Sequence, residues 1–236
     1  MTANVKQVLT QISNNKIFDN ELYFTGGTAL AYYLSHRISE DIDIVSQKAL
    51  NYKEIIPAIT SLGGVKMEDE NVTALRMAGL FPDEYMIKFV IDNVKLEFFQ
   101  ANRAIQKEIL EEATFKSFEN TKLKILDVKS VAKLKIVALI MREKSRDLFD
   151  FGAMIEHKIF SKDEIIEQFS KIKNDLTSIE KISHYIESKK EPLDDEAVYL
   201  SETKRVDLDF EGIKKEVIKS LRSYLLIKNK VFPEKP

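Results

Sequence analysis

The order of apolar and polar residues divides the chain into two parts. Up to about residue 120, short apolar runs that suit strands alternate with amphipathic helical stretches, and after Thr121 the pattern becomes helical. We therefore expect an α+β protein with a mixed sheet and helices in residues 1–120, followed by an all-helical domain in residues 121–236.

The same pattern predicts the individual elements. In the first part it predicts helices over residues 4–17, 28–36 and 51–62, strands over 22–24 and 41–45, and less regular strands over 65–80. The clearest element is a hairpin over Met86–Phe99 whose turn is Asp92-Asn93. In the second part it predicts helices over 128–141 and from Arg146 to about His157 with Ser145 as N-cap, then three or four helices after Ser161 with a charged loop over 188–196.

Composition places few limits on function. The 236 residues are 44% apolar and 31% charged with no cysteine, which is typical of a globular protein and excludes disulfides and thiolate metal sites. A net charge of −2 argues against a protein that binds nucleic acid over its whole surface. Residues 1–15 lack the apolar core of a signal peptide, and the apolar stretch Ile136–Met141 is too short to span a bilayer. We therefore expect a cytoplasmic protein without a membrane partner.

The segment from Gly26 to Asp43 carries most of the chemical information. Gly26-Gly27 separates a predicted strand from a predicted helix, where glycine lets the backbone approach a phosphate and the helix start offers N–H groups. Asp41 and Asp43 lie two positions apart on the next strand, so their carboxylates point to the same side and invite a divalent cation. Each feature alone is usually a turn or a solvated strand face, but together they indicate nucleotidyl transfer.

Glu97 is the candidate third acid. It lies on the second strand of the predicted hairpin, with Leu96 and Phe98 on the opposite face. Two-metal catalysis needs a further acid near the attacking hydroxyl, and Glu97 suits that role. The alternative is a solvent-facing glutamate paired with Lys95, and the pattern does not decide between the two.

A basic stretch follows at residues 122–146, with eight Lys or Arg against two Asp or Glu. A charge run is usually a solvated helix face. However, Lys135 adjoins the apolar run Ile136–Met141, which leaves little polar surface, so the alternative is a cation held at a cleft where it meets a triphosphate. The three histidines show no metal-ligand spacing, and no GxxxxGK[ST] loop is present.

These residues resemble three motifs of the AbiEii/AbiGii-type nucleotidyltransferases, the toxins of bacterial abortive-infection and type IV toxin–antitoxin systems. The first motif is matched by Gly26-Gly27-Thr28-Ala29-Leu30 with His36-Arg37, Ser39 and Asp41-Ile42-Asp43. The second is matched by Leu96-Glu97-Phe98, and the third by Lys135 through Arg142 to Arg146-Asp147-Leu148-Phe149-Asp150. The resemblance covers roughly residues 20–155.

The resemblance implies a beta-type polymerase nucleotidyltransferase fold in which the helical domain completes the active-site cleft. It also implies a nucleoside triphosphate donor and Mg²⁺ or Mn²⁺. The implied catalytic residues are Asp41, Asp43, Glu97 and Lys135, of which the three acids hold the metal. The implied nucleotide-binding residues are Gly26, Gly27, Thr28, Arg37, Ser39, Arg142, Arg146, Asp147 and Asp150.

We thus expect a metal-dependent enzyme that moves a nucleoside monophosphate from a triphosphate to an acceptor, with a cognate antitoxin as partner. The sequence leaves open whether the acceptor is tRNA, a protein or a small molecule. The alternative is an antitoxin or regulatory protein of the same fold that binds nucleotide without transferring it.

Overall fold

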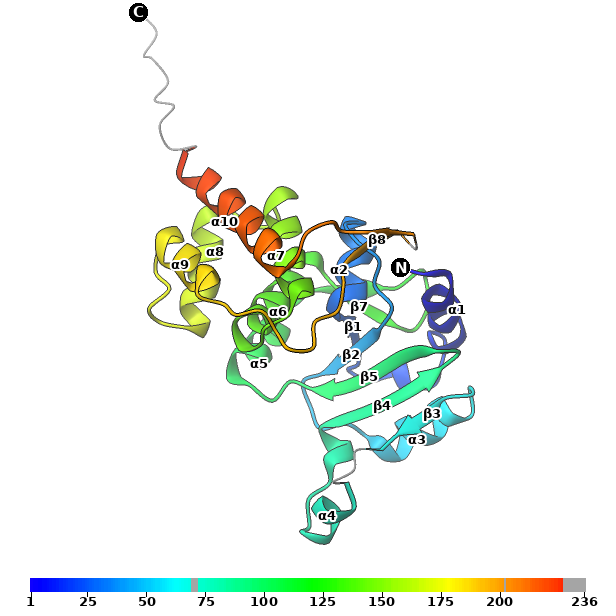
Figure 1. Ribbon diagram of the computed structural model, residues 1–236. Coiled ribbons are helices and arrows are strands. Elements are labelled where there is room, and N and C mark those ends of the chain that lie inside the picture. The colour runs from blue at the N-terminus through cyan, green and yellow to red at the C-terminus, as the bar shows by residue number, and fades with distance from the viewer. Residues whose placement is uncertain (69–71, 202, 227–236) are drawn as a thin grey trace, which may run out of the picture. The chain divides into compact units, whose positions relative to one another are not determined.

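The computed structural model describes residues 1–68, 72–201 and 203–226 (Figure 1). The chain forms two compact units, Met1–Leu134 and Lys135–Pro236. Within the described residues, no helix is both long and apolar enough to cross a membrane.

The first unit is built on a seven-stranded mixed sheet with the strand order β3-β4-β5-β2-β1-β7-β6. Its strands are β1 (Tyr23–Thr25), β2 (Ile42–Ser46), β3 (Val65–Met67), β4 (Met86–Ile91), β5 (Val94–Gln100), β6 (Phe115–Ser117) and β7 (Lys124–Leu126). The pairs β1–β7 and β2–β5 are parallel, and the other neighbouring strands are antiparallel. The mixed sheet that the sequence predicted is therefore present, with β2 and β5 side by side at its centre (Figure 1).

Helices occur before, between and after these strands in the chain. They are α1 (Ala3–Ile12), α2 (Gly26–Leu34), α3 (Tyr52–Thr60), α4 (Val72–Met77), α5 (Ala104–Glu112) and α6 (Val128–Met141), with short 3₁₀ helices η1 (Lys16–Asp19) and η2 (Pro82–Glu84). The core includes one face of the central strands, where Ile42 and Ile44 of β2 and Leu96 and Phe98 of β5 are fully buried. The alternate residues lie on the opposite face, called here the polar face, which carries Asp43, Lys95 and Glu97 but also the buried Val45.

The hairpin prediction is confirmed, and the prediction for residues 65–80 is wrong in part. Asp92 and Asn93 have φ values of 47° and 62°, as a two-residue turn of type I′ requires. Among the residues of the 65–80 segment that the structure describes, which exclude 69–71, only Val65–Met67 is a strand, whereas Val72–Met77 forms the helix α4. Six residues are too few to show a helical period in the sequence.

The strand β7 lies beyond residue 120, where the pattern of apolar residues predicts only helices. It pairs in parallel with β1, so Lys124–Leu126 belongs to the sheet. The Tyr33 hydroxyl of α2 donates to the carbonyl of Leu126 (2.9 Å), and this bond connects α2 to the end of β7.

The second unit is mostly helical. After the C-terminal part of α6 it contains α7 (Ser145–Glu156), α8 (Lys162–Ile172), α9 (Ile179–Glu187) and α10 (Phe210–Leu226), with α10 packed against α7 and α9 (Figure 1). A two-stranded sheet of β8 (Tyr199–Ser201) and β9 (Lys204–Arg205) departs from the all-helical expectation. Both strands are too short to alternate visibly in the sequence.

Candidate active site

The sheet of the first unit places two predicted acids on adjacent strands. Asp43 of β2 is the register partner of Glu97 on the parallel strand β5, and of Thr25 on β1. Register partners on neighbouring strands point to the same face, so both carboxylates lie on the polar face of the sheet. Asp41 is the residue immediately before β2.

Gly26 lies against Asp43 at the start of α2. Its φ is +78°, and a Cβ built on it would lie 1.9 Å from Asp43 Oδ2. Only glycine suits this position, both for its left-handed backbone and for the lack of space. In the sequence, the reason for this glycine was that it lets the backbone approach a phosphate, and that role stays a prediction. The structure adds a second reason: the carboxylate of Asp43 occupies the space that a Cβ would need.

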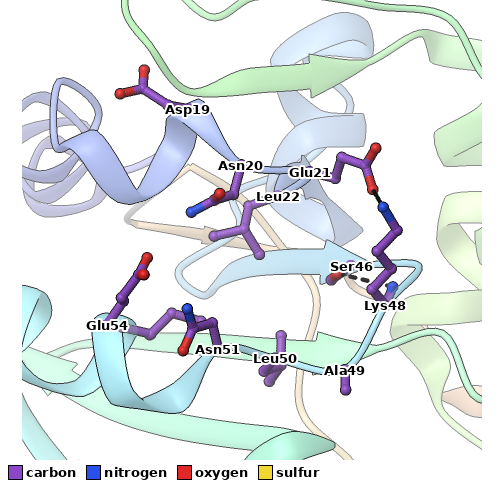
Figure 2. A pocket seen from close by; sticks show the side chains of 11 residues that line it. Asp19, Asn20, Glu21, Leu22, Ser46, Lys48, Ala49, Leu50, Asn51 and Glu54 are labelled. Carbon is purple, nitrogen blue, oxygen red and sulfur yellow. Dashed lines mark hydrogen bonds and ion pairs between the residues drawn. The ribbon is translucent and has the colours of Figure 1, made fainter.

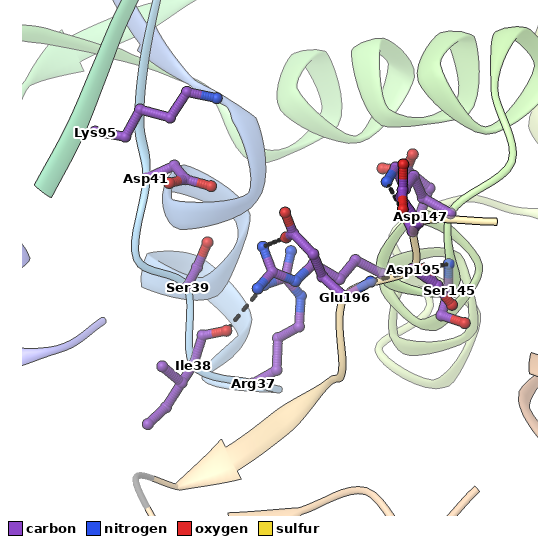
Figure 3. A network of polar contacts seen from close by, with 12 residues as sticks. Arg37, Ile38, Ser39, Asp41, Lys95, Ser145, Asp147, Asp195 and Glu196 are labelled. Atoms are coloured by element: carbon purple, nitrogen blue, oxygen red, sulfur yellow. Dashed lines mark hydrogen bonds and ion pairs between the residues drawn. The ribbon is translucent and has the colours of Figure 1, made fainter. Parts of the chain in front are cut away.

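Hydrogen bonds connect the rest of the first motif. The Thr28 hydroxyl, fully buried in α2, lies 2.8 Å from Ser39 Oγ and also bonds the carbonyl of Asp41. The Arg37 guanidinium is buried and donates to the carbonyl of Ile38 (2.9 Å), as Figure 3 shows. These bonds fix the segment that leads from α2 into β2 and thereby the position of Asp41.

Two lysines accompany Glu97. Its Oε1 lies 2.8 Å from Lys95 Nζ on the same strand and 3.7 Å from Lys88 Nζ on β4. Burial alone would lower the pKa of Lys95, but the hydrogen bond and charge of Glu97, with the charges of Asp41 and Asp43, raise that pKa above its ordinary value. Glu97 therefore pairs with Lys95 and also lies beside Asp43. The ion pair with Lys95, which was the alternative to a role as third acid, is thus present without excluding that role.

These acids suit a magnesium ion by their chemistry. Mg²⁺ prefers oxygen ligands and is usually held by one or two protein carboxylates together with substrate phosphates. Among the described residues, no group of three or more His, Cys, Asp or Glu side chains is arranged to hold a metal. The metal thus stays a prediction, with Asp41 and Asp43 as its principal ligands.

Thr25 is a residue that the sequence reasoning missed. Its hydroxyl is buried, with the residue 2% exposed, and has no hydrogen-bond partner in the structure. It immediately precedes Gly26 and shares a sheet face with Asp43, so a ligand at the start of α2 would meet an unused donor. The alternation of β1 was the available signal, but a strand of three residues barely shows it.

The second unit assembles the third motif around a buried ion cluster. Lys135 is only 8% exposed, and its Nζ lies 3.3 Å from Asp147 Oδ1 and 2.8 Å from Asp150 Oδ2. Arg142 donates two hydrogen bonds to Asp147, from Nε (2.6 Å) and Nη2 (3.1 Å), while its side chain is 58% exposed. Lys135 is therefore not part of a solvated helix face, whereas Arg142 faces solvent.

The two cations of this cluster stabilise the charged form of Asp147. Burial raises the pKa of Asp147, but Lys135 and Arg142 outweigh that effect and lower the pKa below its ordinary value. The guanidinium of Arg142 is the part of this cluster that solvent reaches, since its side chain is 58% exposed.

The start of α7 differs from the prediction. Lys144 is the N-cap and Ser145 is the first helical residue, so the prediction that Ser145 caps the helix is wrong. The backbone N–H of Ser145 instead donates to Asp195 Oδ1 (3.0 Å; Figure 3), and Arg146 forms an ion pair with Glu196. Asp195 and Glu196 lie far along the chain from α7. Helix-capping rules use only the residues next to the helix start, and these rules favoured Ser145 as the cap.

A pocket of about 390 Å³ lies elsewhere in the first unit (Figure 2). It is lined by the end of η1, the link from η1 to β1, the end of β2, the loop after β2 and the start of α3, with Leu22, Leu50 and Glu54 among its residues. Glu21 and Lys48 form an ion pair of 2.9 Å at its rim. It contains none of the predicted site residues.

Comparison with known proteins identifies a family for the chain. The family model described as nucleotidyl transferase AbiEii toxin, type IV toxin–antitoxin system, matches residues 7–224. No curated protein matches the chain significantly. Among solved structures, a proposed nucleotidyltransferase from H. pylori is 17% identical with a TM-score of 0.51, and covers 95% of this chain and 96% of its own. MenT4, a nucleotidyltransferase toxin from Mycobacterium tuberculosis, is 12% identical with a TM-score of 0.55, covering 94% of this chain and 82% of its own. At these identities the two structures support the shared fold.

Proposed function

Because the chain belongs to the AbiEii family of nucleotidyltransferase toxins, we propose that it uses Asp41, Asp43 and Glu97 to move a nucleoside monophosphate from a triphosphate to an acceptor hydroxyl. The observation that carries this proposal is the register of β2 and β5, which sets Asp43 beside Glu97 and against the first turn of α2. Two acids at a helix start suit a site for a metal-bound triphosphate.

The reaction is an in-line displacement. The acceptor oxygen forms a bond to the α-phosphorus while the bond from that phosphorus to the bridging oxygen breaks, and pyrophosphate leaves. Asp41 and Asp43 would hold a divalent cation, which supplies neutralisation of phosphate charge when bound. Glu97 orients the acceptor hydroxyl and takes its proton. Lys95, 2.8 Å from Glu97, keeps that side chain in place on the sheet face.

Cations and backbone groups bind the triphosphate. The N–H groups at the start of α2 and the unused hydroxyl of Thr25 donate to phosphate oxygens. In the second unit, Arg142 is the proposed nucleotide-binding cation that solvent reaches, and Lys135 holds Asp147 and Asp150, the two carboxylates of α7 around which the cluster is built. Lys135 thus takes part mainly through the buried cluster, a more indirect role than a point charge on the phosphates.

The partners follow from the family. We propose that the chain acts as the toxin of a type IV toxin–antitoxin pair, with a cognate antitoxin and with tRNA, a protein or a small molecule as acceptor. We also propose that the reaction takes place in the cytoplasm. The sheet face with Asp43 and Glu97 leaves each of the three acceptor classes open.

The test is a screen with labelled nucleotides. The protein is incubated with each of the four triphosphates, labelled at the α-phosphate, in the presence of Mg²⁺ and separated RNA, protein and small-molecule fractions of a lysate. Label that moves to one fraction, and that disappears with a chelator, supports a metal-dependent transferase and identifies the acceptor class. Nucleotide binding without pyrophosphate release or label transfer would favour the non-catalytic regulatory protein instead.

A further inference from the structure

Two side chains from α9 and the residues after it hold the C-terminal end of α6. The last carbonyls of a helix have no N–H partner within that helix. Here the Tyr185 hydroxyl donates to the carbonyl of Ile140 (2.9 Å), and Lys189 Nζ donates to the carbonyl of Arg142 (3.2 Å). A cation at this end of a helix also interacts favourably with the helix dipole.

Lys189 is unusual for a lysine because it is buried. It is only 4% exposed, and a buried ammonium group is costly unless it is compensated. Its compensation comes from the Arg142 carbonyl, from Glu143 Oε2 at 3.0 Å and from the Tyr185 ring, whose centroid lies 5.1 Å from Nζ. Every one of these contacts lies at the end of α6, in the turn that follows, or in the α9 segment that carries Lys189.

The helix α10 supports Lys189 in turn. Lys214 of α10 is also buried, and its Nζ donates to the carbonyl of Lys189 (3.0 Å) and to Glu211 Oε1 (2.5 Å). Because α10 packs against both α7 and α9 (Figure 1), it fixes the segment that carries Lys189 relative to the helix that carries Asp147. The C-terminal helices, which matched no motif in the sequence, are thereby connected to the third motif.

We propose that Lys189 is a positioning residue for nucleotide binding, which it serves by fixing the backbone of Arg142. With that backbone held, the guanidinium keeps both hydrogen bonds to Asp147, which in turn holds Lys135. The inference rests on the proposed function, in which Arg142 is a nucleotide-binding residue.

The experiment compares Lys189→Met with a matched control, Lys190→Met, which changes the exposed neighbouring lysine. Steady-state kinetics with the triphosphate identified by the label screen give KM and kcat for each variant, and circular dichroism reports folding. Lys189→Met is expected to raise the KM for triphosphate by about tenfold, the scale of one charge-assisted contact, with a smaller change in kcat. Lys189→Arg should recover most of the affinity, and Lys190→Met should match the wild type.

A folded Lys189→Met variant with the KM of the wild type would overturn the inference. So would a loss of kcat alone, because that would place the effect on chemistry rather than on binding. If Lys189→Met does not fold, Tyr185→Phe decides, since it removes only the bond to Ile140: an increase of about threefold in KM supports the clamp, and an unchanged KM refutes it. Wild-type protein that turns over no triphosphate would refute the proposed function itself, and the inference with it.

Discussion

Replacing Gly26 by alanine tests the geometry of the acid site most sharply. The new Cβ would lie 1.9 Å from Asp43 Oδ2, so the carboxylate must withdraw by about 1.5 Å to reach an ordinary van der Waals separation of 3.4 Å. The φ of +78° adds the strain of a left-handed backbone, about 1–2 kcal/mol. With an off-rotamer Asp43 costing about 1 kcal/mol, we expect a total loss of roughly 2–3 kcal/mol in the free energy of unfolding.

The matched control is Gly63→Ala. Gly63 has a φ of +87°, but a Cβ there would meet no atom within 4 Å. This variant therefore has the backbone strain without the overlap, and its expected loss is about 1–2 kcal/mol. Urea denaturation of both variants separates the two contributions.

Activity separates the variants further. A misplacement of about 1 Å at a reacting centre costs roughly 10²-fold in rate, so Gly26→Ala should lose at least that much turnover while Gly63→Ala keeps the wild-type rate. Equal turnover in Gly26→Ala and wild type would show that the position of Asp43 does not matter for catalysis, and would refute the reasoning.

Three further predictions concern Glu97, Lys135 and Asp147. Glu97→Gln should reduce kcat by on the order of 10²-fold with triphosphate affinity little changed, and near-normal turnover in this variant would leave Glu97 as only an ion-pair partner on the sheet. Lys135→Met should lower the free energy of unfolding by about 3–5 kcal/mol in urea denaturation, because it removes the cation from two buried carboxylates. The control Lys122→Met, at an exposed lysine, should leave the free energy of unfolding almost unchanged. Similar small effects in both variants would contradict a buried cluster. Because the pKa of Asp147 is lowered below its ordinary value of 3.8, its charged form stabilises the fold at pH values above 3.8, and this contribution is lost as the pH falls through the folded-state pKa. Acid titration of Asp147→Asn should therefore show a shallower loss of stability below about pH 4 than the wild type. The same loss of stability in both proteins would show that Asp147 makes no such contribution.

Local patterns predicted the elements that are long or have strong turn chemistry. The helix over Val128–Met141 has the predicted bounds, and the hairpin turn at Asp92-Asn93 has the left-handed residues that its sequence favours. The site motif in β2 and α2 was also accessible, because the spacing of carboxylates along a strand fixes the face on which they lie.

Contacts between distant segments were not accessible in this way. The strand β7 has three residues, and only its pairing with β1 makes it a strand. The bond from the Ser145 N–H to Asp195 and the ion pair of Lys135 with Asp150 join residues that no local rule relates. The sequence therefore indicated that Lys135 is chemically important, but it could not show that the lysine is already bound to two carboxylates.

We propose that nucleotidyl transfer depends on Asp43, and pyrophosphate release from three matched proteins tests this dependence. Pyrophosphate release is followed for the wild type, for Asp43→Asn and for Asp92→Asn, which changes an exposed aspartate in the hairpin turn of the same unit. We expect wild-type release from Asp92→Asn and no release above background from Asp43→Asn, whose melting temperature should equal or slightly exceed that of the wild type because a repulsion between acids is removed. Persistent release from Asp43→Asn, together with a marked loss of thermal stability, would show that Asp43 is a structural residue and would contradict the account.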